Sequence, residues 1–410
     1  MTSFDTSLSA PSSRMPAAAR VLVALLARLA YGAVELVAPD GARRAFGPGG
    51  APAPHARSVP AVLQFRDWKV AADALKGGDV AFAESYIDGR WDTPDLTQLL
   101  TVLAANQPAL ERAFRGHWWT RSLLRLKHYM NSNTRRQARR NIVAHYDLGN
   151  DFYRLWLDPT MSYSSALFDG DYTRSMADAQ QAKYGRLLDE LALAPGARIL
   201  EIGCGWGGFA EVAARAGHHV TGISLSDAQT AYARARLDDA GLAAQADLRL
   251  QDYRDVRGQF DGIASIEMFE AVGERYWPAY FAAIRDALRP GGRACIQAIT
   301  IADDRFEQYR TQSDFIQQYV FPGGMLASPA RFVDVAQTVG LSLARVHTFG
   351  RDYAETLKRW LAAFDLNTPA IRAQGFDEKF IRCWRFYLAY CAAGFDTGTT
   401  DVGQYTFVRT

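Results

Sequence analysis

Short apolar runs alternate with segments of helical periodicity along the second half of the chain. Five runs rich in β-branched and other apolar residues predict strands, at Arg198–Ile202, His219–Ser224, 247–250, Phe260–Ile266 and 293–301. Helical patterns lie between them at 226–240 and 276–288. This alternation predicts an α/β fold, an open parallel sheet with helices on both faces. Two later runs, Leu341–Thr348 and 405–410, flank long helical patterns and are expected to close the sheet as an antiparallel edge pair.

The first part of the chain has a different character and predicts a separate small domain. Residues 1–18 are rich in Ser, Ala and Pro and are expected to be disordered. Residues 19–110 mix strand and helix patterns, with a turn at Asp40-Gly41 and helical spacing over 82–91 and 92–103. A linker at 111–140 then leads to a large domain at 141–410.

Composition narrows the class of protein. The 410 residues suggest two or three domains, at about 150 residues each. With 49% hydrophobic and 22% charged residues, the chain is neither disordered nor collagen-like. The apolar run at 21–27 is far shorter than the roughly 20 residues that a membrane span needs. Because the four cysteines have neither metal-ligand nor disulfide-framework spacing, we expect a reducing, cytoplasmic compartment and no metal site.

The linker carries a concentration of positive charge that the net charge of +2 hides. Nine basic residues and no acidic one fall between Arg112 and Arg140, interleaved with leucines and with aromatic residues such as Trp118 and Trp119. Such a segment can rest its apolar side at a lipid headgroup boundary while its cations meet phosphates. It also suits single-stranded nucleic acid, and a solvated linker helix would look similar. The residues alone leave all three interpretations open.

A glycine cluster gives the strongest local signal. The predicted strand Arg198–Ile202 runs directly into Gly203-Cys204-Gly205-Trp206-Gly207-Gly208, and a helical pattern follows. Glycines let the backbone turn tightly and let a ligand approach it closely. The spacing also satisfies a dinucleotide pattern. NAD sites, however, hold the ribose with an acidic residue at the end of the second strand, and here no carboxylate follows that strand until Asp227. Glu201 just before the glycines is typical of S-adenosylmethionine (AdoMet) sites, so AdoMet is favoured over NAD and over a purely structural turn.

Motifs spread over the large domain carry a resemblance to a known family. They are His145-Tyr146-Asp147-Leu148-Gly149-Asn150-Asp151-Phe152-Tyr153, Met161-Ser162-Tyr163-Ser164-Ser165, Gln180-Gln181-Ala182-Lys183, Leu225-Ser226-Asp227-Ala228-Gln229, Gln251-Asp252-Tyr253-Arg254-Asp255, Met268-Phe269-Glu270 and Phe321-Pro322-Gly323-Gly324. From about residue 80 onward the chain resembles the cyclopropane-fatty-acyl-phospholipid synthase family of AdoMet-dependent methyltransferases. The resemblance implies a class I AdoMet-methyltransferase fold, with a Rossmann-like mixed sheet, helices on both faces and a small N-terminal domain.

The resemblance also implies which residues bind the cofactor. The methionine end of AdoMet would meet Tyr146, Tyr163 and Ser164, and the backbone of Gly203 and Gly205 would approach the ligand beside Glu201. The ribose and adenine side would meet Ser224, Leu225 and Gln229, and the adenine would meet Asp252 and Tyr253. Tyrosine rings beside a sulfonium gain roughly 0.5–2 kcal/mol. Core packing is the alternative interpretation for Tyr146 and Tyr163.

The resemblance implies transfer of a methyl(ene) group from AdoMet to the cis double bond of an unsaturated acyl chain in a membrane phospholipid. A carbocation forms and loses a proton to close a cyclopropane, and the cyclopropane-forming members hold bicarbonate as the base. Carried over to this sequence, the catalytic residues are Glu270, Tyr353, Gln297 and Ser165. We expect Glu270→Gln to abolish turnover while AdoMet binding is kept.

Three positions depart from the cyclopropane-forming pattern. Ser165 stands in place of Cys, Ala271 in place of His, and Gln297 in place of a second His. A glutamine amide can donate a hydrogen bond but carries no charge. Either bicarbonate binds with Gln297 as donor, or the site needs no base of that strength. The second case suits methyl-branching or methylenation of the same double bond with a partner reductase, and another methyl acceptor is a further alternative.

Two segments are expected to give access to lipid. The aromatic stretch around 304–324 resembles the insertion that walls the acyl-chain tunnel in the family, although a helix packed on the sheet would look similar. The basic linker would hold the protein peripherally on anionic phospholipid, at the inner face of the cell membrane. We expect no nucleic acid partner, because that reading leaves the glycine cluster, Glu270 and Tyr353 unexplained. The sequence is also compatible with a homodimer.

Overall fold

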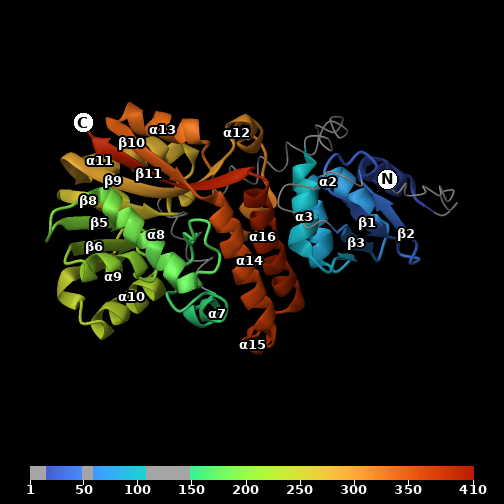
Figure 1. The fold of residues 1–410 in the computed structure, drawn as a ribbon, viewed down its shortest axis with the longest axis horizontal. Helices are drawn as coiled ribbons and strands as arrows, with labels where there is room; N and C mark the ends of the chain where they lie inside the picture. Colours follow the sequence, from blue (N-terminus) through green and yellow to red (C-terminus); the bar gives the residue numbers. More distant parts are fainter. Residues whose placement is uncertain (1–14, 49–58, 108–147) are drawn as a thin grey trace. The chain divides into compact units, whose positions relative to one another are not determined.

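A computed structural model describes residues 15–48, 59–107 and 148–410 of the chain (Figure 1). The chain divides into two compact units, residues 1–120 and 121–410. The basic linker at 111–140 and Tyr146 lie outside the described residues. The segment 1–18 is described only from Met15, and its last two residues already belong to helix α1 (Ala17–Leu26).

The first unit contains a four-stranded sheet in the order β2-β1-β3-β4. Its elements are α1, β1 (Val34–Val37), β2 (Arg43–Phe46), β3 (Ala61–Phe65), α2 (Lys69–Ile87), β4 (Trp91–Asp92) and α3 (Leu96–Ala105). The expected turn at Asp40-Gly41 joins β1 to β2, and Gly41 adopts a φ of +86°. Helices were expected over 82–91 and 92–103. The expectation is wrong where these two ranges meet, because helix α2 ends at Ile87 and Trp91–Asp92 form strand β4. Helix α3 begins only at Leu96, because the Asp95 side chain accepts a hydrogen bond from the Gln98 backbone N–H at 2.9 Å.

The second unit is built on a seven-stranded sheet in the order β10-β11-β9-β8-β5-β6-β7. Its strands are β5 (Arg198–Ile202), β6 (His219–Ser224), β7 (Ala246–Leu250), β8 (Phe260–Ile266), β9 (Leu288–Ile301), β10 (Leu341–Thr348) and β11 (Thr400–Arg409). Strand β11 runs antiparallel to both β9 and β10, so the predicted antiparallel pair at the edge is confirmed. Strand β9 is longer than the predicted strand at 293–301, because it begins at Leu288 and includes Pro290-Gly291-Gly292.

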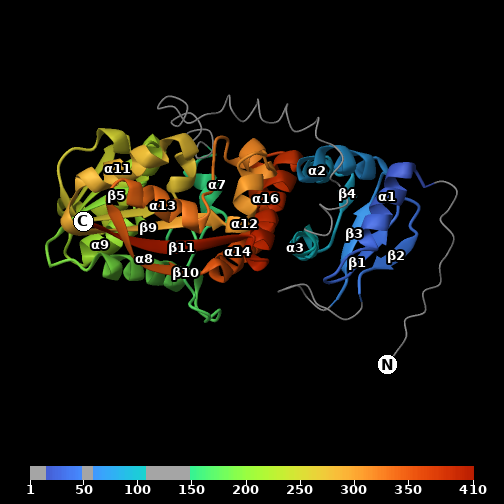
Figure 2. The same ribbon diagram turned by 90° about the horizontal axis from the view of Figure 1, so that it is seen from above.

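Helices cover both faces of this sheet, which confirms the predicted α/β class (Figure 2). Helices α8 (Met176–Leu191), α9 (Gly208–Arg215) and α10 (Asp227–Asp239) pack on one face around side chains such as Leu187 and Phe209. Helices α11 (Trp277–Ala287) and α13 (Pro329–Thr338) pack on the other face around Trp277 and Phe332. Each such fully buried side chain contributes roughly 1.5–3 kcal/mol. These two cores fix the strand ends against the helices that follow them.

The remaining helices of the second unit flank the edge of the sheet. Helices α14 (Gly350–Leu366) and α16 (Glu378–Asp396) pack along each other beside β11, with α15 (Thr368–Ala373) between them in sequence (Figure 1). Helix α7 (Asn150–Arg154), helix α12 (Asp303–Tyr309) and a π-helical turn at Ile316–Val320 complete the unit. Among the helices that the structure describes, none is long and apolar enough to cross a membrane.

The order of the strands reverses between β5 and β8, and this reversal positions the site. Strand β5 leads to β6 and β7 on one side, whereas β8 leads to β9 on the other. In open α/β sheets, ligands bind outside the carboxyl ends of the strands at such a switch point. Gly203 follows β5 and Glu267 follows β8, so both residues stand at this point.

Candidate active site

A pocket lies at the carboxyl ends of β5, β6 and β8. It is lined by seven of the predicted cofactor-binding residues, Gly203, Gly205, Ser224, Leu225, Gln229, Asp252 and Tyr253. Residues that were not predicted complete the lining, among them Gln251, Arg254, Glu267 and Met268. The structure therefore brings the glycine cluster, the end of β6 and the loop after β7 to one place, as a cofactor site requires. The contacts of individual residues with AdoMet remain predictions.

The turn at Gly203 contributes backbone atoms, and no side chain of its own, to the pocket lining. Gly203 adopts a φ of +86°, and an added Cβ atom would lie 2.9 Å from Cγ of Met268. Its N–H donates to the carbonyl of Ile223 at 2.9 Å, which ties the turn to β6. Only glycine combines this φ with such a close neighbour. The turn consequently requires glycine, and Gly203 lines the pocket next to Met268.

Polar side chains close the other end of the pocket. The Asp252 carboxylate accepts hydrogen bonds from the Arg254 side chain, at 2.8 Å from Nε and 2.6 Å from Nη2, and from the Arg254 backbone N–H at 3.0 Å. This pairing raises the pKa of Arg254. Helix α10 starts beside it, where the Ser226 side chain accepts from the Gln229 backbone N–H. The carboxylate that is predicted to meet adenine is thus fixed in place before any ligand arrives.

Of the described residues that were predicted to bind the cofactor, Tyr163, Ser164 and Glu201 lie outside the pocket lining. The Tyr163 hydroxyl lies 2.8 Å from the Tyr387 hydroxyl. The Ser164 hydroxyl accepts a hydrogen bond from Nζ of Lys183 at 2.5 Å. Glu201 is buried, and burial raises its pKa to about 8. The cofactor-binding role of these three residues remains a prediction.

A second cluster, which we call the carboxylate centre, surrounds Glu267 at the end of β8. Its Oε1 atom accepts hydrogen bonds from the Ser165 backbone N–H at 2.9 Å and from Nε2 of Gln297 at 2.8 Å. Its Oε2 atom accepts from the Tyr353 hydroxyl at 2.6 Å. Three of the four predicted catalytic residues therefore meet, and they meet on a glutamate that the sequence analysis did not select.

Glu270, the fourth predicted catalytic residue, is bound differently. Its Oε1 atom accepts from the Ile299 backbone N–H at 2.5 Å, while Oε2 is buried without a hydrogen-bond partner among the described residues. Burial, reinforced by the charge of Glu267, raises the pKa of Glu270 to about 8. Glu270 is consequently mostly protonated at neutral pH and is not bonded to Ser165, Gln297 or Tyr353. Its catalytic role remains a prediction.

Lys183 brings a cation close to the carboxylate centre. It is fully buried in helix α8, where its Nζ atom bonds to Ser164 and lies 4.1 Å from the centre of the Tyr184 ring. Burial lowers its pKa to about 7, against the opposing attraction of Glu267. A buried lysine is rare unless it is paired. The negative charge of nearby carboxylates, Glu267 first among them, favours the protonated form of Lys183.

The electrostatics of the carboxylate centre suit proton transfer. Burial raises the pKa of Glu267, although the Tyr353 hydroxyl and Lys183 oppose the rise. Burial and the charge of Glu267 together raise the pKa of Tyr353, so the tyrosine keeps its proton and remains a donor. A desolvated carboxylate with a raised pKa is a stronger base than an exposed one. Because Glu267 also lines the cofactor pocket, this base stands next to the place where the methyl donor would bind.

Sequence reasoning missed Glu267 and Lys183, although signals for both exist. Lys183 ends one of the motifs that carry the family resemblance. Glu267 is the first residue after a buried strand, at the strand end where an open parallel sheet binds its ligands. Topology would have favoured Glu267 over Glu270, which lies further along, in a 3₁₀ turn at Phe269–Ala271.

The aromatic insertion around 304–324 packs against its own unit. Phe306 joins the core that contains Trp277, and Phe315 packs edge-on against Phe386 of α16 with ring centres 4.9 Å apart. Directly after the insertion, the Met325 N–H donates to the carbonyl of Glu270 at 2.8 Å. The insertion is therefore tied to the turn that follows the carboxylate centre, and its role as a tunnel wall remains a prediction.

Comparison with known proteins bears on this site. A family model described as mycolic acid cyclopropane synthetase matches residues 133–405. The chain is similar to a tuberculostearic acid methyltransferase, UfaA1, of Mycobacterium tuberculosis, with 40% identity over 359 residues that cover 86% of this chain and 84% of that protein. It is also similar to the cyclopropane-fatty-acyl-phospholipid synthase of Escherichia coli, with 34% identity over 357 residues that cover 86% and 89%.

A solved structure agrees with the fold. The mycolic acid cyclopropane synthase CmaA1, complexed with SAH and CTAB, superposes with a TM-score of 0.62 and 31% identity, covering 66% of this chain and 98% of that one. The predicted class I AdoMet-methyltransferase fold is thereby confirmed. Because SAH is what remains of AdoMet after methyl transfer, the likeness also supports AdoMet as the cofactor.

Proposed function

The chain belongs to the mycolic acid cyclopropane synthetase family, and we propose that it transfers the methyl group of AdoMet to the cis double bond of an unsaturated acyl chain in a membrane phospholipid. It is an AdoMet-dependent methyltransferase of a lipid-modifying family. The observation that carries the proposal is the buried carboxylate centre beside the cofactor pocket. Methylation of an alkene needs a base in this position, whereas methylation of an amine or a hydroxyl does not generate a carbocation.

The residues around the cofactor pocket and the carboxylate centre suit this chemistry. AdoMet, when bound, supplies an electrophilic methyl group. An alkene is a poor nucleophile, and the methylated chain carries a positive charge on carbon that water would trap. The buried rings of Tyr353 and Trp360 lie 6.2 Å apart, and the Tyr163 and Trp360 rings 5.4 Å apart. Aromatic faces and the Glu267 carboxylate would stabilise that charge without offering a nucleophilic water.

The product that we favour is a methyl-branched or methylene chain. Ser165, Ala271 and Gln297 depart from the cyclopropane-forming pattern, and the Mycobacterium relative is named a methyltransferase of a fatty acid. A saturated methyl branch needs hydride from a partner reductase. The second candidate is a cyclopropane, which is favoured by the family description and by the name of the Escherichia coli relative.

Expression in a bacterial host that lacks such activity tests the proposal. We expect mass spectrometry of the phospholipid acyl chains to show a gain of one CH₂ for a methylene or cyclopropane chain, and of one CH₂ plus two hydrogens for a saturated methyl branch. Proton NMR then separates the products, because a cyclopropane loses its olefinic protons and shows ring protons, whereas a methylene chain shows an exocyclic CH₂. Unmodified acyl chains, together with no SAH release from purified protein and unsaturated phospholipid vesicles, would refute the proposal.

Peripheral membrane binding belongs to the same proposal. The nine cations between Arg112 and Arg140 suit the anionic inner face of a cell membrane. We expect the protein to float with vesicles that contain anionic lipid at low salt and to detach at high salt, because salt screens such contacts. Neutral vesicles are the control. Binding that ignores both salt and lipid charge would contradict a role for the basic run.

A further inference from the structure

Resting on the proposed function, we infer that Glu267 is the base that takes the proton from the methylated acyl chain, in place of a bound bicarbonate. The family resemblance assigns bicarbonate to donors at three of this chain's positions, the Ser165 backbone, Gln297 and Tyr353. All three donate to the Glu267 carboxylate, at 2.9, 2.8 and 2.6 Å. The Ser165 N–H and the Tyr353 hydroxyl each have one proton, and both protons are already donated to Glu267, so the anion position of bicarbonate is taken by a carboxylate of the chain itself.

The backbone at Glu267 is specialised for this position. Its φ is +48°, a left-handed value that residues with a side chain seldom adopt. Non-glycine residues in such conformations cluster at functional sites, where the surroundings hold them. The Glu267 N–H donates to the Gln297 carbonyl at 2.8 Å, and the three donors hold the carboxylate from the other side. The strained turn therefore holds Glu267 at the cofactor pocket, which this residue lines.

A chain of side-chain amides fixes which atom Gln297 presents to Glu267. Nη1 of Arg186 donates to Oε1 of Gln404 at 2.7 Å, and Nε2 of Gln404 donates to Oε1 of Gln297 at 3.2 Å. Nε2 of Gln297 then donates to Glu267. Because a guanidinium has donors only, the arginine sets the direction of every hydrogen bond in the chain. We call this chain the amide relay, and it keeps an N–H group turned toward the carboxylate at any pH.

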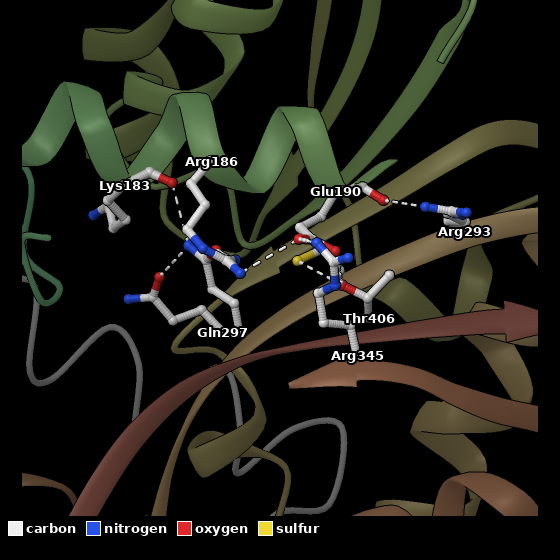
Figure 3. A network of polar contacts seen from close by, with 9 residues as sticks. Lys183, Arg186, Glu190, Arg293, Gln297, Arg345 and Thr406 are labelled. Atoms are coloured by element: carbon white, nitrogen blue, oxygen red, sulfur yellow. Dashed lines mark hydrogen bonds and ion pairs between the residues drawn. The ribbon is translucent and has the colours of Figure 1, made fainter. Parts of the chain in front are cut away.

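The outer end of the amide relay is itself anchored. Figure 3 shows Lys183, Arg186 and Glu190 pointing from helix α8 toward the strands below it. The Glu190 carboxylate pairs with Arg186 at 3.3 Å and with Arg345 at 3.1 Å, and it accepts from the Thr406 hydroxyl at 3.0 Å. Arg186 is thus held from the side opposite to Gln404. The geometry makes Arg186 and Gln404 positioning residues for the base.

The proton balance of the proposed step is simple. Methyl transfer leaves a carbocation beside the carbon that carries the new methyl group. For a methylene product, the hydrogen on the methyl-bearing carbon shifts as hydride to the cationic carbon, one C–H bond of the methyl group breaks, and its electron pair becomes the second bond of the C=CH₂ group. For a cyclopropane, no hydride shifts and the electron pair of a methyl C–H bond closes the ring. In both cases the proton forms an O–H bond on Glu267. The protonated glutamate then releases its proton to water before the next turnover. No oxidant or reductant takes part in this step.

The experiment measures kcat of the full-length protein on unsaturated phospholipid vesicles, by SAH release and lipid mass, with and without bicarbonate in CO₂-free buffer. We expect wild-type kcat to be independent of bicarbonate. Glu267→Gln should lower kcat by about a hundredfold or more, because it removes the base but keeps the shape. Glu378→Gln is the matched control, since Glu378 pairs with Arg372 on the surface of α16.

Two further variants sharpen the test. Glu267→Gly frees the three donors and suits the left-handed backbone, so we expect millimolar bicarbonate to restore kcat about tenfold over the rate without it. Glu270→Gln is the competing variant, because the sequence analysis places the catalytic carboxylate there. It should lower kcat less than Glu267→Gln does, since Glu270 is mostly protonated at neutral pH. AdoMet titration of each variant confirms that it is folded.

The possible outcomes separate the inference from the proposed function. A wild-type protein that needs bicarbonate, a Glu267→Gln variant with near wild-type kcat, or a larger loss in Glu270→Gln would each overturn the inference while leaving lipid methylation in place. A wild-type protein that methylates no lipid in either buffer would instead overturn the proposed function.

Discussion

The cofactor pocket and the carboxylate centre stand at neighbouring strand ends but are built from different materials. The pocket depends on the backbone of a continuous glycine motif after β5, at Gly203 and Gly205. The carboxylate centre depends on the side chains of Glu267, Gln297 and Tyr353 and on one backbone N–H, contributed by four separate parts of the chain. The first can be recognised from a local motif, whereas the second exists only after folding. Experiments that disturb one site at a time can test whether this division is real.

The largest effect is expected at the pocket, from Gly203→Ala. The added methyl group would require a left-handed alanine, which costs about 1–2 kcal/mol, and would press on Met268, at about 1–3 kcal/mol for overpacking. We expect the free energy of unfolding to fall by the sum of both and AdoMet affinity to fall about tenfold or more, because Met268 also lines the pocket. Denaturant unfolding and calorimetric titration measure the two effects.

Gly217→Ala is the control for that substitution. Gly217 has nearly the same φ, +85° against +86°, but nothing lies within 4 Å of an added Cβ. It should therefore lose only the backbone part of the stability and keep AdoMet affinity. Equal affinity losses in the two variants would mean that crowding at Met268 is not what protects the pocket.

At the carboxylate centre, Tyr353→Phe should have the next largest effect. It removes the donor to Oε2 of Glu267 and leaves the stacked ring in place. Losing a hydrogen bond to a charged group costs about 1.5–3 kcal/mol, so kcat should fall about 10- to 100-fold while AdoMet affinity stays. Tyr280→Phe, which removes a buried hydroxyl bonded to Ser265, is the control and should leave the rate nearly unchanged. If Tyr353→Phe changed AdoMet affinity instead of kcat, the carboxylate centre and the cofactor pocket would not be separate functional sites.

The pH dependence of kcat reports the charge around Glu267. Its pKa is raised by burial, so activity should be lost on the acid side at a higher pH than that at which an exposed glutamate titrates. The groups that face it are Lys183, Glu270 and Tyr353. Lys183→Met removes a cation that favours the ionised form, so the acid limb should move upward by on the order of one pH unit. Lys358→Met, which removes a half-buried cation of α14 that pairs with Asp396 at 2.8 Å, is the control; an unmoved limb in Lys183→Met would place the titrating base elsewhere.

The smallest effect is expected at the outer end of the amide relay. Arg186→Met removes the donor to Gln404, which should lower kcat about two- to tenfold and shift the acid limb upward. Arg345→Met is the control. Arg345 also pairs with Glu190, but no hydrogen bond joins it to Gln404, so its loss should change neither kcat nor the acid limb. If both variants behave alike, Arg186 contributes to the stability of the fold and does not set the direction of the hydrogen bonds in the amide relay.

The same division explains how far the sequence could predict the molecule. Strands β5, β6 and β8 begin and end where apolar periodicity placed them, because each is bounded by turn residues and buried on both faces. Strand β9 was predicted too short, because Leu288 already pairs with Phe260 of β8 and the Pro290-Gly291-Gly292 segment lies at an irregularity of that pairing. Seven cofactor residues converge on one pocket, since they follow the strand ends in order.

Glu267 escaped prediction for a physical reason. Apart from its place directly after β8, nothing in the local sequence distinguishes it from Glu270, three residues later. What separates them is the set of donors brought to one carboxylate by α14, β9 and the segment before α8, and contacts so distant in sequence leave no periodic pattern. The burial of Lys183 was hidden in the same way.

The left-handed backbone at position 267 has a consequence for how such enzymes can diverge. Glycine is the residue that this conformation favours, and glutamate and glycine codons differ by a single nucleotide. One point mutation could therefore exchange a base encoded in the gene for one taken from dissolved CO₂, with no other residue replaced. The activity of such a lineage would then follow the carbon dioxide content of its surroundings, whereas an enzyme that carries Glu267 would be indifferent to it.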